Sequence, residues 1–236
     1  MKLSNIAKAA ASALLELPCP GCDQATPEND NSLCADCLAE LSAIPEPICP
    51  GCGGAVDGAL NECSDCLEAG SRPWDLARSL YLYSGTSREL ILRFKFRRRP
   101  ELAWLFAPRL EELLSEFPCR FDAIVPIPLS RERRFMRGYN QCALLAEILS
   151  DATGIPVVNS LKRRGRSGHQ SLRGRKERLA AMKRAFVPRK GVELEGKKVL
   201  LLDDVFTTGA TLTAAGMAIQ WLHPTYVGVV TIARCL

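Results

Sequence analysis

Two adjacent carboxylates have the clearest chemical potential in this sequence. Asp203 and Asp204 follow the apolar run 199–202 and precede the loop Thr207-Thr208-Gly209-Ala210-Thr211. Carboxylates at a strand end can accept hydrogen bonds from the vicinal hydroxyls of a sugar. A loop that opens a helix presents backbone N–H groups and a favourable dipole to an anion. Together these features predict a site for a ribose 5-phosphate.

Helix capping is the simpler explanation for part of this segment. Thr207 or Thr208 alone could cap a helix that follows a strand. A cap does not account for two acids against an apolar strand, nor for three threonines around one glycine. We therefore favour the sugar-phosphate site. The segment resembles the diphosphate-sugar signature of type I phosphoribosyltransferases, which bind 5-phosphoribosyl-1-diphosphate (PRPP) with Mg²⁺.

Eight of the 11 cysteines form four Cys-x-x-Cys pairs in an internal repeat. Two such pairs supply the four thiolates of a tetrahedral structural zinc site. The short spacing within each repeat favours two local Zn²⁺ sites, made by Cys19, Cys22, Cys34 and Cys37 and by Cys49, Cys52, Cys63 and Cys66. A crossed arrangement between the repeats and an iron–sulfur cluster stay open as alternatives. The other cysteines have no partner spacing and are expected to be ordinary packed thiols: Cys119, Cys142 and Cys235.

The elements that would position these residues alternate along the chain. The sequence predicts strands over residues 77–83, 121–127, 198–202 and 226–233, and helices over residues 86–97, 101–117, 138–153, 176–183 and 210–222. This alternation favours an α/β fold with a parallel sheet and helices on both faces. The two acids would then lie at the carboxyl edge of the sheet, where such folds bind ligands.

Positive charge is concentrated in a few segments, although the net charge is only +5. Residues 162–190 hold twelve lysines and arginines against one acid, Glu177. Within it, residues 163–178 could close as a loop over a bound diphosphate or follow a nucleic-acid backbone. A second basic stretch, expected to be a loop, contains Arg131, Arg133, Arg134 and Arg137. Arginine forks match diphosphate oxygens well.

Three further motifs agree with a narrower family. Val125-Pro126-Ile127-Pro128 precedes Arg137-Gly138-Tyr139-Asn140-Gln141, and Leu92-Arg93-Phe94-Lys95 ends a predicted helix. With the cysteine-rich region, these motifs resemble the ComF competence-protein family (ComFC/GntX-like), which joins a zinc module to a phosphoribosyltransferase domain. The sequence departs from the expected pattern at Gly165 and Ala181, where we expect arginine and asparagine.

The resemblance implies a double zinc ribbon over residues 18–70 and a phosphoribosyltransferase-like domain over residues 71–236. An apolar stripe predicts an amphipathic helix over residues 1–17. The implied reaction is pentosyl transfer from Mg-PRPP to a nitrogen nucleophile. Asp203 and Asp204 would be catalytic and hold the ribose hydroxyls, and residues 207–211 would bind the 5-phosphate. The diphosphate would be bound by Arg133, Arg137 and Lys95.

The family resemblance also implies an alternative function. ComF proteins are associated with natural transformation, so the chain could be a non-catalytic protein that handles single-stranded DNA and retains the fold. Its partners would then be single-stranded DNA or proteins of the DNA-uptake machinery. The acid-rich ribbon region is a poor DNA surface, which leaves the arginine-rich second domain as the candidate. No apolar run could span a membrane and no signal peptide is recognisable, so we expect a cytoplasmic protein.

Overall fold

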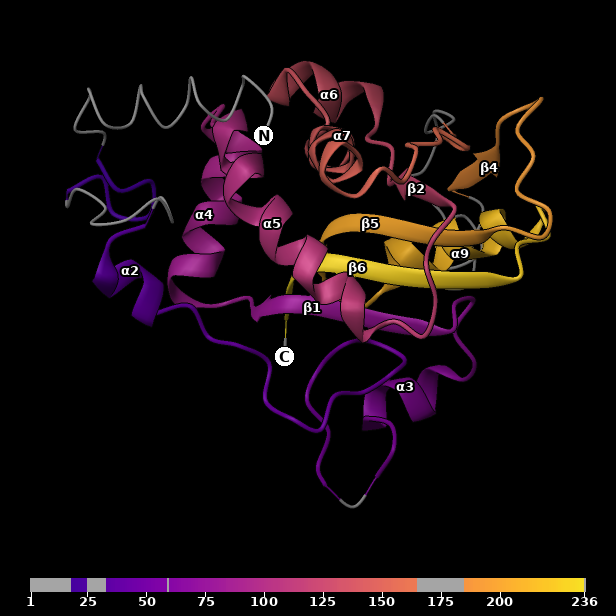
Figure 1. Ribbon diagram of the computed structural model, residues 1–236, viewed down its shortest axis with the longest axis horizontal. Helices are drawn as coiled ribbons and strands as arrows, with labels where there is room; N and C mark the ends of the chain where they lie inside the picture. The colour runs from indigo at the N-terminus through magenta and orange to yellow at the C-terminus, as the bar shows by residue number, and fades with distance from the viewer. Residues whose placement is uncertain (1–17, 25–32, 59, 165–184, 236) are drawn as a thin grey trace, which may run out of the picture.

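The computed structural model describes residues 18–24, 33–58, 60–164 and 185–235 (Figure 1). The helices predicted over residues 1–17 and 176–183 lie outside these residues. So do Gly165 and Ala181, together with most of the predicted basic loop. Among the described residues, no helix combines the length and the apolar character that crossing a membrane requires.

A four-stranded parallel sheet forms the centre of the protein. Its strand order is β1-β6-β5-β2, and the strands are β1 (Leu76–Leu82), β2 (Ala123–Pro126), β5 (Lys198–Phe206) and β6 (Tyr226–Arg234). Successive residues of a strand point to opposite faces. In β5, Leu200 and Leu202 join one hydrophobic core, whereas Val199 and Leu201 join the other. Burial on both faces explains the continuous apolar runs and confirms the predicted α/β fold class.

Different helices cover the two faces of the sheet (Figure 1). One face carries α4 (Gly85–Phe96), α5 (Ala103–Leu113) and α7 (Gln141–Thr153), with the 3₁₀ turns η1 (Pro100–Leu102) and η2 (Leu114–Glu116) at the ends of α5. The other face carries α9 (Ala210–Gln220) and an antiparallel hairpin of β3 (Leu161–Arg163) and β4 (Phe186–Pro188).

The two cysteine repeats pack on different cores. The first repeat, with α2 (Ala35–Ala39), joins the core beneath α4 and α5. The second repeat, with α3 (Ser64–Ala69), joins the core beneath α9. Figure 1 shows α2 near α4 and α3 below β1. Each repeat therefore contacts the sheet domain separately.

The structure differs from the sequence prediction in three places. The basic stretch predicted as a loop forms a helix, α6 (Arg131–Arg137). The Ser130 side chain caps its first turn by accepting a hydrogen bond from the backbone N–H of Arg133 (3.3 Å), and Gly138 ends it at a positive φ of 82°. Strand β5 continues through both acids to Phe206 instead of ending at Leu202. The predicted helix over residues 101–117 is divided into η1, α5 and η2.

Candidate functional site

Asp203 and Asp204 lie near the carboxyl end of β5, in contact with α4 and α7. Lys95 of α4 forms an ion pair with Asp204, with 2.7 Å between its Nζ and the Asp204 Oδ1. The Cys142 thiol of α7 donates a hydrogen bond to the Asp203 Oδ1 (S···O 3.4 Å). Both carboxylates are mostly buried. The structure therefore brings these four residues together from three separate parts of the chain.

Burial changes the protonation of this acid cluster. Burial and the charge of Asp204 raise the pKa of Asp203 to about 7. Burial and the two carboxylates also raise the pKa of the Cys142 thiol well above its usual value. Cys142 is consequently a neutral S–H donor at neutral pH, whereas Asp203 lies near its titration midpoint. A cationic or hydroxyl-rich ligand would favour the ionised form of Asp203.

This shift predicts an unusual pH dependence of stability. Because the folded pKa exceeds the unfolded value, the native state holds a proton that the unfolded chain releases between about pH 4 and pH 7. The resulting stability is complete at low pH and is lost as the pH rises through 7. Asp203→Asn should therefore raise the melting temperature of the ligand-free protein at pH 8 by several degrees.

Thermal unfolding between pH 5 and pH 8 would measure this effect. Glu147→Gln, which changes an exposed acid on α7, is the matched control and should not alter the pH profile. An Asp203→Asn variant with the wild-type dependence on pH would contradict the assignment.

The Arg137-to-Gln141 motif holds the end of α4 over the acids. The fully buried Gln141 donates a hydrogen bond to the Lys95 carbonyl (3.5 Å) and accepts one from Arg137 (3.0 Å). The Tyr139 hydroxyl donates to the Phe94 carbonyl. The Arg137 guanidinium lies 4.9 Å from the centre of the Phe96 ring and is itself buried. The motif thus fixes the position of Lys95.

Arg163 supplies positive charge near Asp203. Burial and the charge of Arg133 lower the pKa of Arg163, whereas the negative charge of Asp203 opposes this shift. Arg163 ends β3, and its guanidinium stacks 5.2 Å from the centre of the Phe186 ring. Arg133 is exposed on α6. Arg163 therefore interacts electrostatically with both Asp203 and Arg133.

The predicted phosphate loop connects β5 to α9. Thr207 and Thr208 are exposed, and Gly209 begins the helix at a positive φ of 73°. A Cβ atom at Gly209 would lie 2.7 Å from the Phe206 ring. Only glycine satisfies both the conformation and the packing of this position.

Gly209→Ala should therefore destabilise the protein by about 2–4 kcal/mol. This corresponds to a fall of roughly 5–12 °C in melting temperature for a chain of this size. Gly154→Ala is the matched control, because Gly154 also has a positive φ (76°) but has open space around the added Cβ. Equal losses in the two variants would show that contact with Phe206 is unimportant.

Two groups of four cysteines fit structural zinc. Within each group, the sulfur atoms lie within 4.8 Å of one another. The first group consists of Cys19, Cys22, Cys34 and Cys37, and the second of Cys49, Cys52, Cys63 and Cys66. Backbone N–H groups also point at the sulfurs, with 3.3 Å from the Cys34 nitrogen to the Cys19 Sγ. The corresponding contact in the second group joins Cys63 and Cys49 (3.4 Å). Four thiolates fill a tetrahedral zinc site, which suits a structural role.

Comparison with known proteins identifies the family. A model of the double zinc ribbon domain matches residues 10–67. Competence protein ComFC of Bacillus subtilis is 34% identical over 189 residues, which cover 78% of this chain and 75% of that protein. Competence protein F of Haemophilus influenzae is 31% identical over 211 residues, which cover 86% and 91%. The chain belongs to the ComF family.

Among solved structures, the ComF chain resembles the glutamine PRPP amidotransferase of B. subtilis complexed with ADP and GMP. The identity is 19% and the TM-score is 0.43, and the match covers 60% of this chain but only 30% of the amidotransferase. The family membership predicted from the cysteine repeats and the Arg137-to-Gln141 motif is thus confirmed by the ComF relatives.

Sequence analysis of this ComF chain did not single out two residues of the site. Cys142 was expected to be an ordinary packed thiol, and Arg163 was noticed only as part of the basic segment. Cys142 lies in α7 and Arg163 in β3, and the tertiary fold brings both close to Asp203. Cys142 is 61 residues from Asp203 in the sequence. Local spacing carries no signal for such long-range contacts.

Proposed function

We propose that this ComF protein binds PRPP with Mg²⁺ and transfers the phosphoribosyl group to a nitrogen nucleophile. The observation that carries the proposal is the buried pair Asp203 and Asp204, directly ahead of the loop that opens α9. The carboxylates accept hydrogen bonds from the ribose 2- and 3-hydroxyls. Backbone N–H groups and hydroxyls of residues 207–211 bind the 5-phosphate.

The chemistry is a substitution at C1 of the ribose. The bond from C1 to the diphosphate oxygen breaks, the diphosphate leaves with the electron pair, and a C1–N bond forms. Positive charge develops on the ribose, and the two carboxylates stabilise it electrostatically. Mg²⁺, when bound, would supply positive charge that stabilises the leaving diphosphate, and Asp203 and Asp204 are the carboxylates that would hold it. No general base is assigned, since the acceptor can lose its own proton.

Cationic side chains bind the leaving diphosphate in this proposal. Arg163, which interacts electrostatically with Asp203, and Arg133, which interacts with Arg163, neutralise its oxygens. Lys95 exchanges its ion pair with Asp204 for contacts with the ligand. Arg137, expected from sequence to bind diphosphate, is buried and bonded to Gln141, which favours a role in positioning Lys95.

Calorimetric titration of PRPP, with and without Mg²⁺, into purified zinc-loaded protein tests the proposal. We expect binding only when the metal is present, followed by diphosphate release when a suitable nitrogen acceptor is added. A folded protein that takes up no PRPP under either condition would exclude the function.

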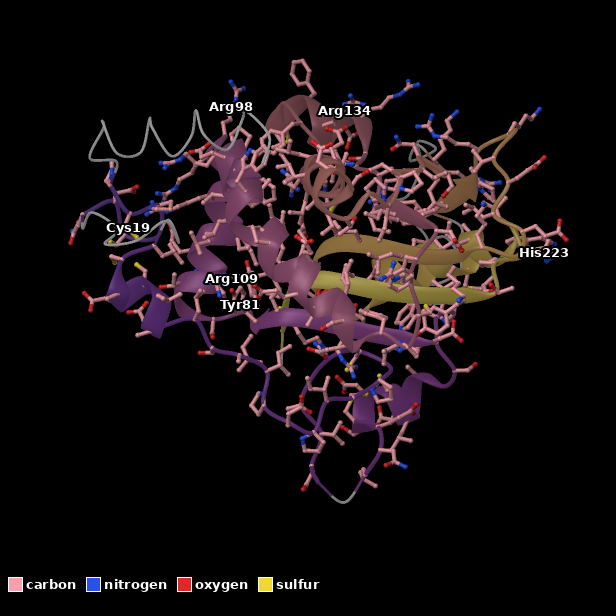
Figure 2. The ribbon with its side chains drawn as sticks, viewed as in Figure 1. Cys19, Tyr81, Arg98, Arg109, Arg134 and His223 are labelled. Atoms are coloured by element: carbon pink, nitrogen blue, oxygen red, sulfur yellow. The ribbon has the colours of Figure 1, made fainter. Side chains whose placement is uncertain are left out.

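A basic and aromatic surface favours a second candidate function, the handling of single-stranded DNA. This surface consists of Phe96, Arg98, Arg131, Arg134 and Phe135, all of them exposed. The contact of Arg137 with Phe96 joins the end of α4 to α6, and Figure 2 shows Arg98 and Arg134 at the same upper edge. Positive charge with exposed rings suits a backbone with stacked bases. The relatives' names refer to competence, which agrees with this chemistry.

Phe135→Ala should weaken binding of a single-stranded oligonucleotide about tenfold, because stacking contributes roughly 1–3 kcal/mol per base. The Phe135 side chain is suited to this role, since the residue is 89% exposed. Fluorescence anisotropy at fixed salt would measure the change. Trp221→Ala removes another exposed aromatic side chain (77% exposed), next to α9, and should have no effect. Identical affinities for all three proteins would remove this surface from the interface.

A further inference from the structure

Two arginines connect the second cysteine repeat to the predicted phosphate loop. Arg234, the last residue of β6, places its Nη2 3.8 Å from the Cys52 Sγ, and its Nη1 donates to the Thr207 carbonyl (2.9 Å). Arg72 places its Nη2 3.6 Å from the Cys66 Sγ and its Nη1 3.5 Å from the Thr213 hydroxyl in α9. Each guanidinium therefore contacts a ribbon sulfur and also the loop or its helix.

The Phe206 ring lies between the ribbon and the loop. The guanidinium of Arg234 is 4.9 Å from its centre, and that of Arg72 is 6.0 Å away. Strand register pairs Phe206 directly with Arg234. Gly209 packs closely against Phe206 and Arg72, since an added Cβ would approach both the Phe206 ring and the Arg72 guanidinium. The loop conformation consequently depends on where the two arginines lie.

The negative charge of the second cysteine site stabilises the two arginines. Four thiolates around Zn²⁺ leave the site with two negative charges, and Arg234 is only 6% exposed. The Nε atoms of Arg72 and Arg234 are buried and have no hydrogen-bond acceptor in the described part of the chain. A buried guanidinium is stable only while opposite charge is nearby. The thiolates of the second site supply this charge, with Asp65 3.8 Å from Arg234 as a further, exposed partner.

The first cysteine site is connected differently. Its nearby arginine, Arg93, donates to the Pro20 carbonyl (3.0 Å) and pairs with Asp23 and Glu89. The sulfurs of Cys19 and Cys34 accept hydrogen bonds from backbone N–H groups. Arg93 also lies in α4, on the opposite face of the sheet from α9. Only the second site is linked to the loop by the arginine contacts described above.

We propose that zinc at the second site positions the phosphate loop through Arg234 and Arg72, so that zinc and a sugar phosphate bind cooperatively. The choice of a sugar phosphate as the ligand rests on the proposed function, whereas the connection of zinc to the loop through the arginines does not. By thermodynamic linkage, a ligand that binds only to the positioned loop must in turn raise the affinity of the second site for zinc. Arg234 and Arg72 are positioning residues in this arrangement.

The first experiment needs no ligand. The rate of zinc release to a chromophoric chelator is measured for the wild type, Arg234→Gln and Arg234→Lys. Zinc release from the second site is the kinetic phase that is missing in Cys63→Ser. We expect Arg234→Gln to release this zinc about tenfold faster, by the loss of a buried charge partner. Arg234→Lys should restore most of the difference, and Arg93→Gln is the control. Hydrogen exchange in residues 207–213 should rise in Arg234→Gln and in Cys63→Ser, and it should stay at the wild-type level in Arg93→Gln.

The second experiment adds ribose 5-phosphate as the probe. It should slow zinc release from the second site about fivefold, within the usual range of coupling between sites. Release from the first site, assigned with Cys34→Ser, should stay constant, and the effect should vanish in Arg234→Gln. If ribose 5-phosphate binds without slowing release, the inference is overturned and the sugar site stands. If it does not bind at all, the sugar site fails, and the ligand-free experiment still decides the arginine link.

Discussion

The double variant Asp203→Asn/Asp204→Asn should lose at least a hundredfold in affinity for Mg-PRPP. Hydrogen bonds to charged acceptors contribute about 1.5–3 kcal/mol each, so the loss of two ionised carboxylates removes roughly 3–6 kcal/mol of binding energy. Both residues are mostly buried, and only β5 presents two carboxylates side by side at this edge of the described sheet. Calorimetric titration measures the affinity, and elemental analysis should find the zinc content unchanged.

A matched control separates the site from the change in net charge. Glu147→Gln/Asp151→Asn removes the same two charges from exposed positions of α7. It should leave PRPP affinity at the wild-type value. If the Asp203/Asp204 variant keeps its affinity while folding normally, these carboxylates do not hold the ribose. If both variants lose affinity equally, the effect is one of overall charge.

The single variants should differ from each other. Asp204 is paired with Lys95, so Asp204→Asn leaves a mostly buried lysine without its carboxylate. Asp203 is held by a neutral thiol, and its removal relieves the cost of burying a second negative charge. Stability and affinity thus change in opposite directions at Asp203. Such opposition is common where a binding site is built at the expense of stability.

Local sequence patterns predicted those parts of the structure that depend on near neighbours. The apolar run before Asp203 predicted a strand because burial on both faces needs no alternation, and the sheet confirms this. The cysteine spacing predicted two local groups because a Cys-x-x-Cys turn directs both sulfurs to one centre, and the structure brings the sulfurs together in this arrangement. The helix α6 was missed because its arginines suggested a solvated loop, although Ser130 and Gly138 carried capping signals.

Contacts made across the sheet could not be predicted in this way. Arg234 reaches Cys52 across 182 residues, and Arg72 reaches Thr213 across 141. These contacts follow from strand order, since β6 lies between β1 and β5 and places Arg234 beside Phe206. The sequence around a charged residue at the end of an apolar strand does not predict such distant partners. The link between zinc ribbon and loop is therefore a property of the tertiary fold.

Zinc removal should have the largest effect on the fold. The second ribbon contains few large apolar side chains, but Cys49, Cys52 and Cys66 are almost fully buried in the core beneath α9. Trp74 is also anchored there by a hydrogen bond from its ring nitrogen to the Gly51 carbonyl (2.9 Å). Without the metal, four thiols replace the site, and the buried Arg234 and the half-buried Arg72 lose the negative charge of the thiolates that they contact.

We expect Cys49→Ser, or complete chelation of the zinc, to lower the melting temperature by about 6–20 °C. This range follows from a loss of ~3–5 kcal/mol, since each kcal/mol shifts the melting temperature of a chain of this size by about 2–4 °C. Thermal unfolding with parallel determination of zinc would measure it. Cys119→Ser is the control, since Cys119 lies outside both sulfur groups and is only partly buried. A zinc-free protein with an unchanged melting temperature would mean that the ribbon packs on the sheet without its metal, and that the apolar contacts of Trp74 and Phe206 are sufficient to hold it there.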